Sequence, residues 1–270
     1  MNHAETMAFL GTKQWLDAAE EGRPLYGSLP SMLNHEEWSL LYHLTRTCYL
    51  GYGEVVDLGA FLGGSTVRLA KGLRDRGIRD RVMHSYDRFV TDDFLVTWIP
   101  GLLAQGRFRH LYDANVAPFA DLIEVHDGDI LSQPWLGRPI EILFVDVAKT
   151  WQINEHLVRS FFPSLIPGVS LVVQQDYLHE WLPWLHVTME SFADHFDYVT
   201  DTRNNSVVFS YERRIPTDRL LGFDWMKMGM DAKVALIDRA IARFADERQA
   251  SYIREARNVL LKGKPDRMVT

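Results

Sequence analysis

The chain has 270 residues, of which 47 % are apolar, a length that suits one α/β domain with additions or at most two small domains, and we favour one. The formal net charge is −7, and the lack of a basic cluster argues against a nucleic-acid partner. A single cysteine, Cys48, excludes an internal disulfide and a cysteine-based metal cluster. The N-terminus lacks a basic region followed by an apolar stretch, and no apolar run reaches about eighteen residues, so we expect a soluble, cytoplasmic protein with no membrane partner.

Two helices are predicted before the first strand. The second starts at Asn34, with Glu37 three residues later as its capping partner, and apolar residues follow at helical spacing. Residues 1–50 are therefore expected to form an N-terminal helical cap over the carboxyl edge of a sheet.

Residues 54–69 predict a buried strand that ends at Asp57, a tight turn and the start of a helix. The turn and helix start carry Gly59, Gly63, Gly64 and Ser65. Because glycine has no Cβ, such a turn lets backbone amides approach a nucleotide-like ligand closely. The glycine spacing differs from the Gly-x-Gly-x-x-Gly of dinucleotide-binding proteins. The carboxylate of Asp57 would repel a pyrophosphate but attract an ammonium or a sulfonium group.

Polar residues also follow the next four predicted strands. Residues 81–87 end in Asp87, residues 121–126 lead into Asp129 and Ile130, residues 141–146 end in Asp146, and residues 169–176 end in Asp176. Open α/β sheets bind ligands at this edge, and a carboxylate at the tip of the second strand can accept hydrogen bonds from both ribose hydroxyls. A hairpin over residues 196–211 adds two more strands. Residues 217–262 are predicted to be mostly helical, either as a dimer contact or packed on their own domain.

The pattern Asp-Leu-Gly-x-x-x-Gly-Gly-Ser, with the strand ends in this order, resembles the class I S-adenosylmethionine (SAM) methyltransferases. The resemblance implies an α/β fold with a Rossmann-like sheet of seven strands over residues 51–212, between the helical cap and a C-terminal helical extension at 213–270. It implies SAM as the cofactor. The binding residues would be Asp57, Gly59, Gly63, Gly64, Ser65, Asp87, Asp129 and Ile130.

The arrangement of Asp146 and Lys149, three residues apart after the fourth strand, resembles that of the metal-dependent O-methyltransferases of the catechol type. There the equivalent aspartate holds magnesium and the lysine three residues later is the general base. The rest of that metal site follows the fifth strand as Asp-Asn, or as Asp-Asp-Tyr in the macrocin (TylF-like) sugar O-methyltransferases. This chain has Gln175-Asp176-Tyr177. An amide replaces one carboxylate, so the implied Mg²⁺ site of Asp146, Gln175 and Asp176 would bind more weakly, and metal dependence is left open.

Each candidate catalytic residue has an alternative role. Asp146 is also suited to cap the following helix, and Lys149 to pair with it in solvent; His179 is the alternative base. The aromatic residues between 177 and 186 would either line an acceptor pocket or belong to the core. The remaining histidines have no sequence partner that singles them out as functional, among them His84, His126 and His156.

We therefore expect a SAM-dependent methyltransferase that acts on a hydroxyl group of a small-molecule acceptor, such as a sugar or a secondary metabolite. The alternatives are an NAD-type nucleotide-binding domain, which the glycine spacing and Asp57 disfavour, and a SAM-fold module without catalytic activity. A homodimer is left open.

Overall fold

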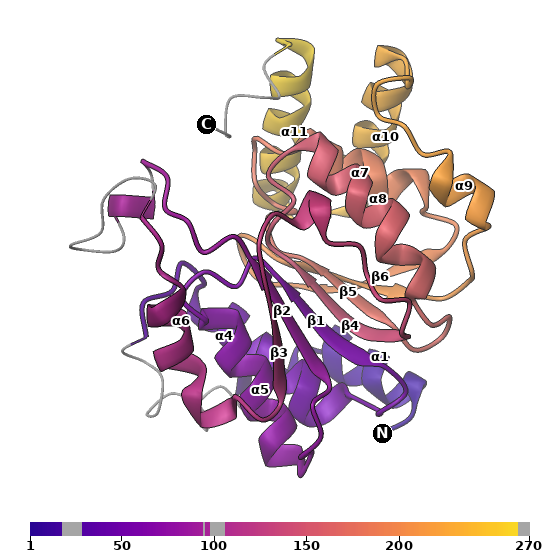
Figure 1. Ribbon diagram of the computed structural model, residues 1–270. Coiled ribbons are helices and arrows are strands. Elements are labelled where there is room, and N and C mark those ends of the chain that lie inside the picture. The colour runs from indigo at the N-terminus through magenta and orange to yellow at the C-terminus, as the bar shows by residue number, and fades with distance from the viewer. Residues whose placement is uncertain (18–28, 94, 98–105, 264–270) are drawn as a thin grey trace. The chain divides into compact units, whose positions relative to one another are not determined.

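The computed structural model describes residues 1–17, 29–93, 95–97 and 106–263 (Figure 1). It contains a seven-stranded sheet in the order β3-β2-β1-β4-β5-β7-β6, flanked by helices, which confirms the predicted α/β class. The chain divides into two compact units, one of residues 1–133 with 141–143, and one of residues 134–140 with 144–270. The two units are described separately.

All seven strands lie close to their predicted positions. They are β1 (Glu54–Leu58), β2 (Met83–Asp87), β3 (Ile123–Asp127), β4 (Ile140–Val145), β5 (Leu171–Gln174), β6 (Phe196–Asp201) and β7 (Val207–Tyr211). In the first unit, β1 pairs with β2 and β2 pairs with β3, both in parallel. In the second unit, β7 runs antiparallel to both β5 and β6. Polar residues at the ends of parallel strands therefore meet at one edge of each unit's part of the sheet.

The described helices of the first unit are short and mostly precede or follow β1. They are α1 (His3–Gly11), α2 (Gln14–Asp17), α4 (His35–His43), which continues into a π-helical turn (Leu44–Cys48), α5 (Gly64–Arg76) and α6 (Arg109–Val116). Helix α4 begins with the predicted capping box. The side chain of Asn34 accepts a hydrogen bond from the backbone N of Glu37 (3.1 Å), and the carboxylate of Glu37 accepts one from the backbone N of Asn34 (2.9 Å).

Helices α4 and α5 lie side by side (Figure 1), and Gly72 of α5 is the point of closest approach. A Cβ at this position would lie 2.1 Å from Thr45 Oγ1 and 2.4 Å from the carbonyl oxygen of Tyr42. The Thr45 hydroxyl donates across the contact to the carbonyl oxygen of Leu69 (2.8 Å). The two helices thus approach backbone to backbone.

A buried carboxylate anchors the loop that enters β1. Glu141 is 2 % exposed and accepts hydrogen bonds from the backbone N of Leu50, of Tyr52 (2.6 Å) and of Gly53 (3.1 Å). Burial raises the pKa of Glu141, although these backbone donors act in the opposite direction. The carboxylate therefore satisfies three backbone donors that would otherwise be left without a partner.

The second unit carries the C-terminal helices. They are α7 (Trp151–Ser160), α8 (Pro183–Ser191), α9 (Thr217–Leu221), α10 (Met230–Arg243) and α11 (Glu247–Leu261). Helix α10 packs against α8 and α11 (Figure 1). Its residues Ile237 and Ala240 are fully buried. The buried carboxylate of Glu190 on α8 accepts from the guanidinium of Arg243 on α10. The prediction that residues 217–262 are mostly helical is confirmed, and α10 packs on its own unit.

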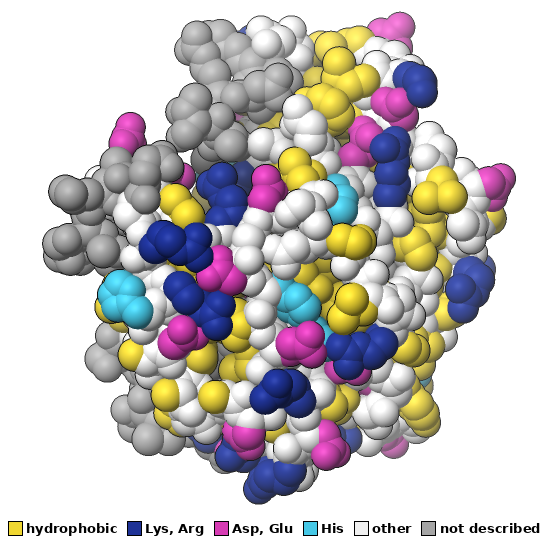
Figure 2. Space-filling model, in the orientation of Figure 1, with side chains coloured by type: hydrophobic (Ala, Val, Ile, Leu, Met, Phe, Trp, Pro, Cys, Tyr) yellow, Lys and Arg dark blue, Asp and Glu magenta, His cyan; other side chains and the backbone are white. Residues whose placement is uncertain are grey.

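Within the described residues, no helix combines the length and the hydropathy that a membrane span requires. On the described part of the face in Figure 2, acidic and basic side chains are interspersed.

Candidate functional site

The turn between β1 and α5 is shaped by glycines in the left-handed region and by hydrogen bonds to β2. Gly59 and Gly63 have φ angles of 98° and 91°, which residues with a Cβ rarely adopt. The backbone N of Gly59 donates to the carbonyl oxygen of Tyr86 (2.9 Å) and holds the turn at the end of β2. Helix α5 starts at Gly64, and its first amides have no partner within the helix. The amides of Gly59 and Gly63 in the turn donate within the protein. The backbone donors beside the ends of β1 and β2 are therefore those at the start of α5, and their contact with a ligand stays a prediction.

Asp57 lies beneath this turn and is fully buried. Its carboxylate accepts hydrogen bonds from the hydroxyl of Ser65 (3.0 Å to each oxygen) and from the hydroxyl of Thr66 (2.6 Å). Burial raises the pKa of Asp57 to about 7; the two hydroxyls act in the opposite direction, and the nearby carboxylate of Asp87 adds to the increase. In this structure Asp57 fixes the first turn of α5, and its attraction to a bound SAM stays a prediction.

Asp87 ties the tip of β2 to the glycine turn. Its carboxylate accepts from the backbone N of Phe61 (2.8 Å) and from that of Phe89 (2.7 Å). Burial raises the pKa of Asp87, and these two donors partly offset the increase. Each carboxylate oxygen has a second lone pair, so the half-buried group retains acceptor capacity for the hydroxyls of a ribose.

Asp129 and Ile130 follow β3 in a short turn of the first unit. The exposed side chain of Asp129 accepts from the backbone N of Leu131 (3.0 Å) and caps the single 3₁₀ turn Ile130–Ser132. Ile130 is 5 % exposed. The backbone N of Gly128 donates to the carbonyl oxygen of Asp87 (3.0 Å). This bond holds the turn next to the tip of β2, where the proposed adenosine contacts would be made.

In the second unit, Lys149 joins the ends of β4 and β5. Its ammonium donates to Asp146 Oδ1 (2.6 Å) and to Asp176 Oδ2. Burial alone would lower the pKa of Lys149, but attraction by the two carboxylates outweighs it and raises the pKa above its ordinary value. A lysine that acts as a general base needs a lowered pKa, so the raised pKa of Lys149 does not favour the base role that the resemblance implies. The structure does unite Asp146, Lys149 and Asp176, which the sequence had placed at two strand ends.

The residues expected to hold Mg²⁺ do not form an open metal site in this arrangement. Carboxylate oxygens suit the ion, but the ammonium of Lys149 occupies the position between Asp146 and Asp176. Gln175 is 6 % exposed, and its backbone N donates to the carbonyl oxygen of Val145 (3.0 Å). Magnesium would fit this donor set only after Lys149 had moved, so we derive no step through the ion.

His179 lies half-buried in the turn after β5. Its backbone N donates to the carbonyl oxygen of Asp176 (2.9 Å), and its Nδ1 accepts from the backbone N of Trp181 (3.3 Å). Three of the aromatic residues considered for an acceptor pocket are buried in the core instead, namely Tyr177, Trp184 and His186. The Trp184 indole donates to the carbonyl oxygen of Ala148 (2.7 Å) and thereby supports the loop that carries Lys149.

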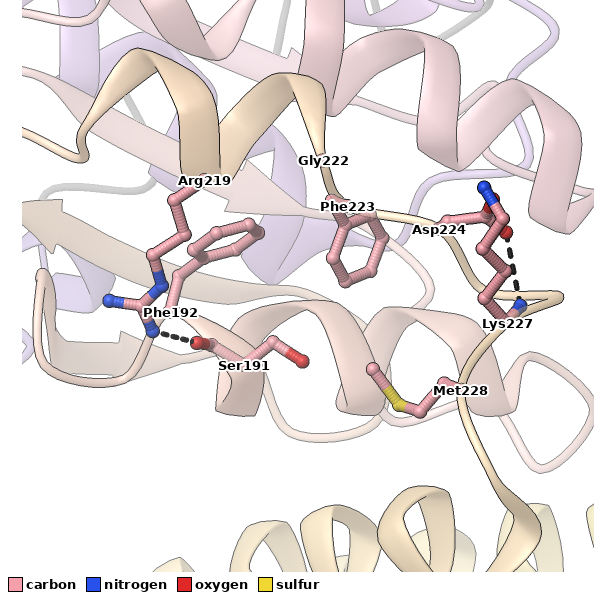
Figure 3. A pocket seen from close by; sticks show the side chains of 8 residues that line it. All are labelled: Ser191, Phe192, Arg219, Gly222, Phe223, Asp224, Lys227 and Met228. Atoms are coloured by element: carbon pink, nitrogen blue, oxygen red, sulfur yellow. Dashed lines mark hydrogen bonds and ion pairs between the residues drawn. The ribbon is translucent and has the colours of Figure 1, made fainter.

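A pocket of about 360 Å³ lies elsewhere in the second unit, between the end of α8 and the segment that follows α9 (Figure 3). Phe192 and Phe223 form its apolar wall, and Arg219 lies over the ring of Phe192 with 5.4 Å from the guanidinium carbon to the ring centre. The ammonium of Lys227 pairs with the carboxylate of Asp224 (3.0 Å). None of the residues predicted to be functional lines this pocket.

Sequence reasoning missed several residues that the structure brings to these sites. Thr66 completes the hydrogen bonds of Asp57, and its place directly after Gly-Gly-Ser was an available signal. His84 and His126 were treated as unrelated, yet they lie side by side in the first unit with 2.9 Å between Nδ1 and Nε2. Only the register of β2 against β3 could have predicted that contact.

Comparisons with known proteins identify the fold. The chain matches no family model and no curated protein sequence. The solved structure of the O-methyltransferase NovP has a TM-score of 0.55 at 14 % identity, over 78 % of this chain and 98 % of NovP. The apo structure of CalS11, a TDP-rhamnose 3'-O-methyltransferase in calicheamicin biosynthesis, has a TM-score of 0.51 at 15 % identity, over 78 % of this chain and 94 % of CalS11. The chain therefore has the class I methyltransferase fold.

Proposed function

We propose that this chain, which has the class I methyltransferase fold, is a SAM-dependent methyltransferase that acts on a hydroxyl group of a small molecule. The observation that carries the proposal is the glycine turn of the first unit, with Asp57 beneath it and Asp87 at the tip of the next strand. Two of the similar structures, NovP and CalS11, are O-methyltransferases, and CalS11 acts on a sugar nucleotide. They support a hydroxyl acceptor on a sugar or a secondary metabolite.

The first unit would bind the cofactor. When bound, SAM supplies an electrophilic methyl group on a positively charged sulfur. The amides at the start of α5 would bind its carboxylate end, because the helix N-terminus carries partial positive charge. Asp87 would accept from the ribose hydroxyls with the lone pairs that Phe61 and Phe89 leave over. Asp129 would accept from the adenine amine, and Ile130 would contact the ring.

The second unit would prepare the acceptor. A sugar hydroxyl has a pKa above the ~10 of a phenol, so it needs a group that takes its proton or a charge that stabilises its oxygen. With the pKa of Lys149 raised, its ammonium would stabilise the developing oxyanion. Asp146 or Asp176 would then accept the proton, and His179 is the alternative base.

Binding experiments separate this proposal from its rivals. Calorimetry with SAM, S-adenosylhomocysteine and NAD should show binding of the first two and no response to NAD. Tight binding of NAD without a response to SAM would make the chain an NAD-type domain. A matched pair of variants, Asp87→Asn and Asp113→Asn, tests the site: only the change at the tip of β2 should weaken SAM binding.

Turnover tests the second half of the proposal. Protein supplied with SAM carrying a labelled methyl group, and with a panel of sugar nucleotides and phenols, should release labelled product. Activity that survives exhaustive chelation would show that Mg²⁺ is unnecessary; if Mg²⁺ is required, Gln175→Asp should tighten its binding. SAM binding without methylation of any acceptor would instead favour a SAM-fold module without catalytic activity.

A further inference from the structure

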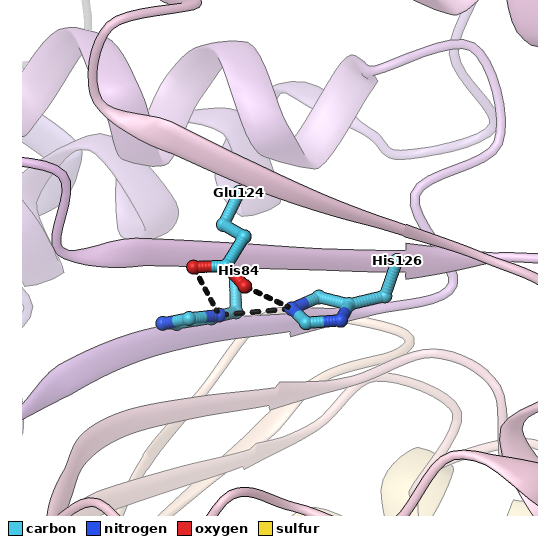
Figure 4. Close-up of side chains that lie close together, drawn as sticks. All are labelled: His84, Glu124 and His126. Carbon is cyan, nitrogen blue, oxygen red and sulfur yellow. Dashed lines mark hydrogen bonds and ion pairs between the residues drawn. The ribbon is translucent and has the colours of Figure 1, made fainter.

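Three side chains with metal-binding atoms lie together on one face of β2 and β3, apart from the glycine turn. The parallel register pairs His84 with Glu124, and His126 lies two residues further along β3, on the same face. His84 Nδ1 is 2.9 Å from His126 Nε2, and each of these nitrogens is 3.9 Å from an oxygen of Glu124 (Figure 4). All three belong to the first unit.

A second carboxylate faces the far side of the buried histidine. Glu54 Oε2 of β1 lies 3.6 Å from His84 Nε2. A carboxylate in that place favours the tautomer with the proton on Nε2, which leaves the lone pair of Nδ1 directed at His126. His126 Nε2 would then donate its proton to His84 Nδ1. For a metal ion to bind both nitrogens, the proton of His126 would shift from Nε2 to Nδ1, so that His84 Nδ1 and His126 Nε2 each offer a lone pair.

The ring of His126 is held in place for such a role. It stacks on Tyr86 with 4.0 Å between ring centres and an angle of 6° between planes. The side chain of His84 is 0 % exposed, that of His126 is 16 % exposed and that of Glu124 is 40 % exposed. Both imidazoles are therefore ordered before an ion arrives, and the carboxylate of Glu124 lies at the solvent side of the group.

We propose that His84 Nδ1, His126 Nε2 and the Glu124 carboxylate form a site for a borderline divalent metal ion, with Zn²⁺ as the reference ion. Two imidazoles and one carboxylate suit such ions better than Mg²⁺. Ligand atoms about 2.0–2.1 Å from a tetrahedral zinc ion lie roughly 3.3 Å apart. The two nitrogens lie 2.9 Å apart, and each lies 3.9 Å from a Glu124 oxygen, so the observed distances fall on either side of this value. Small side-chain rotations would therefore bring the three ligand atoms to the distances that a tetrahedral ion requires.

The site would act by joining two strands. An ion there links β2 to β3, and Glu54 supports it from β1 through the far nitrogen of His84. Water would complete the coordination. The bound ion would stabilise the first unit. This metal site is independent of the proposed methyl transfer, because none of its residues belongs to the groups proposed to bind SAM or the acceptor.

Calorimetry on untagged protein, first treated with chelator, tests the site with Zn²⁺ alone. We expect one ion per chain, a higher midpoint of thermal unfolding with Zn²⁺, and weaker binding at acidic pH, because an imidazole must be unprotonated to bind a metal ion. His126→Phe keeps a ring against Tyr86 and removes the nitrogen, so binding should fall by roughly 100-fold or more. His110→Phe makes the same change at an exposed histidine of α6 and should bind Zn²⁺ as the wild type does.

In Glu124→Gln, a loss of Zn²⁺ binding is not explained by misfolding, because this side chain is 40 % exposed. It should weaken Zn²⁺ binding by about tenfold or more and leave the circular dichroism spectrum unchanged. The proposal is overturned if the wild-type protein binds no Zn²⁺, or if both His126→Phe and Glu124→Gln bind it as the wild type does. Loss of binding in Asp146→Asn alone would also overturn it, since the ion would then lie at the end of β4.

Discussion

Replacing Asp57 by asparagine should change how the stability of the protein depends on pH. The pKa of Asp57 is about 7 in the folded chain, against about 3.9 for aspartate in an unfolded chain. A difference of about 3 pH units, at about 1.36 kcal/mol each, corresponds to at most ~4 kcal/mol in the free energy of unfolding. Because the folded pKa is the higher one, this stabilisation is fully present below pH ~4. It is lost as the pH rises through about 7.

Asparagine keeps an oxygen that accepts from Ser65 and Thr66 but cannot ionise. Urea unfolding of both proteins between about pH 4.5 and 8.5 measures the effect. The stability of the wild type relative to Asp57→Asn should fall with pH by up to ~4 kcal/mol. Burial also raises the pKa values of Asp87 and Glu141. The contribution of Glu141 is common to both proteins and cancels in the comparison. Asp87 interacts with Asp57, so part of the measured difference belongs to this pair of carboxylates. Parallel stability curves over the whole range would refute the reasoning.

Three further variants test other parts of the structure. Asp87→Ala removes hydrogen bonds to a charged acceptor, worth about 1.5–3 kcal/mol, so calorimetry should show a ten- to hundredfold loss of SAM affinity; an unchanged affinity would exclude the ribose contact. Lys149→Met should lower turnover by roughly 10² or more at unchanged SAM affinity. Because the pKa of Lys149 is raised, the wild-type rate should show no ionisation near neutral pH that this variant lacks. Glu141→Ala leaves three backbone donors without their carboxylate and should lower the free energy of unfolding by ~3 kcal/mol or more, measured by urea denaturation.

The positions of the strands along the chain and the glycine turn were predictable because their signals are local. Each strand is a short apolar run that ends in a polar residue, and the turn before α5 carries glycines where the backbone has positive φ. The start of α4 was equally clear, since Asn34 and Glu37 stand at the spacing of a capping box. Such features depend on residues no more than a few positions apart.

The electrostatics of the candidate sites depend on contacts between residues far apart in the chain. The spacing of Asp146 and Lys149 predicted that they would meet, but the pKa of Lys149 is also set by Asp176, which lies 27 residues away. Similarly, the contact between His84 and His126 requires the register of two strands. Composition alone could not decide whether Trp184 lines a pocket or supports a loop.

The close approach at Gly72 has a consequence for redesign of this fold. Glycine within a helix costs about 1 kcal/mol relative to alanine, so a procedure that scores α5 by helix propensity would replace it. The added methyl group would meet Thr45 Oγ1 at 2.1 Å and a backbone carbonyl at 2.4 Å, and the two helices would have to separate. Gly77, just beyond the same helix, has open space around it and is required only for its φ of 96°. At the second position asparagine is the residue that tolerates this φ best after glycine, although any Cβ there is strained, whereas the first position admits no residue larger than glycine.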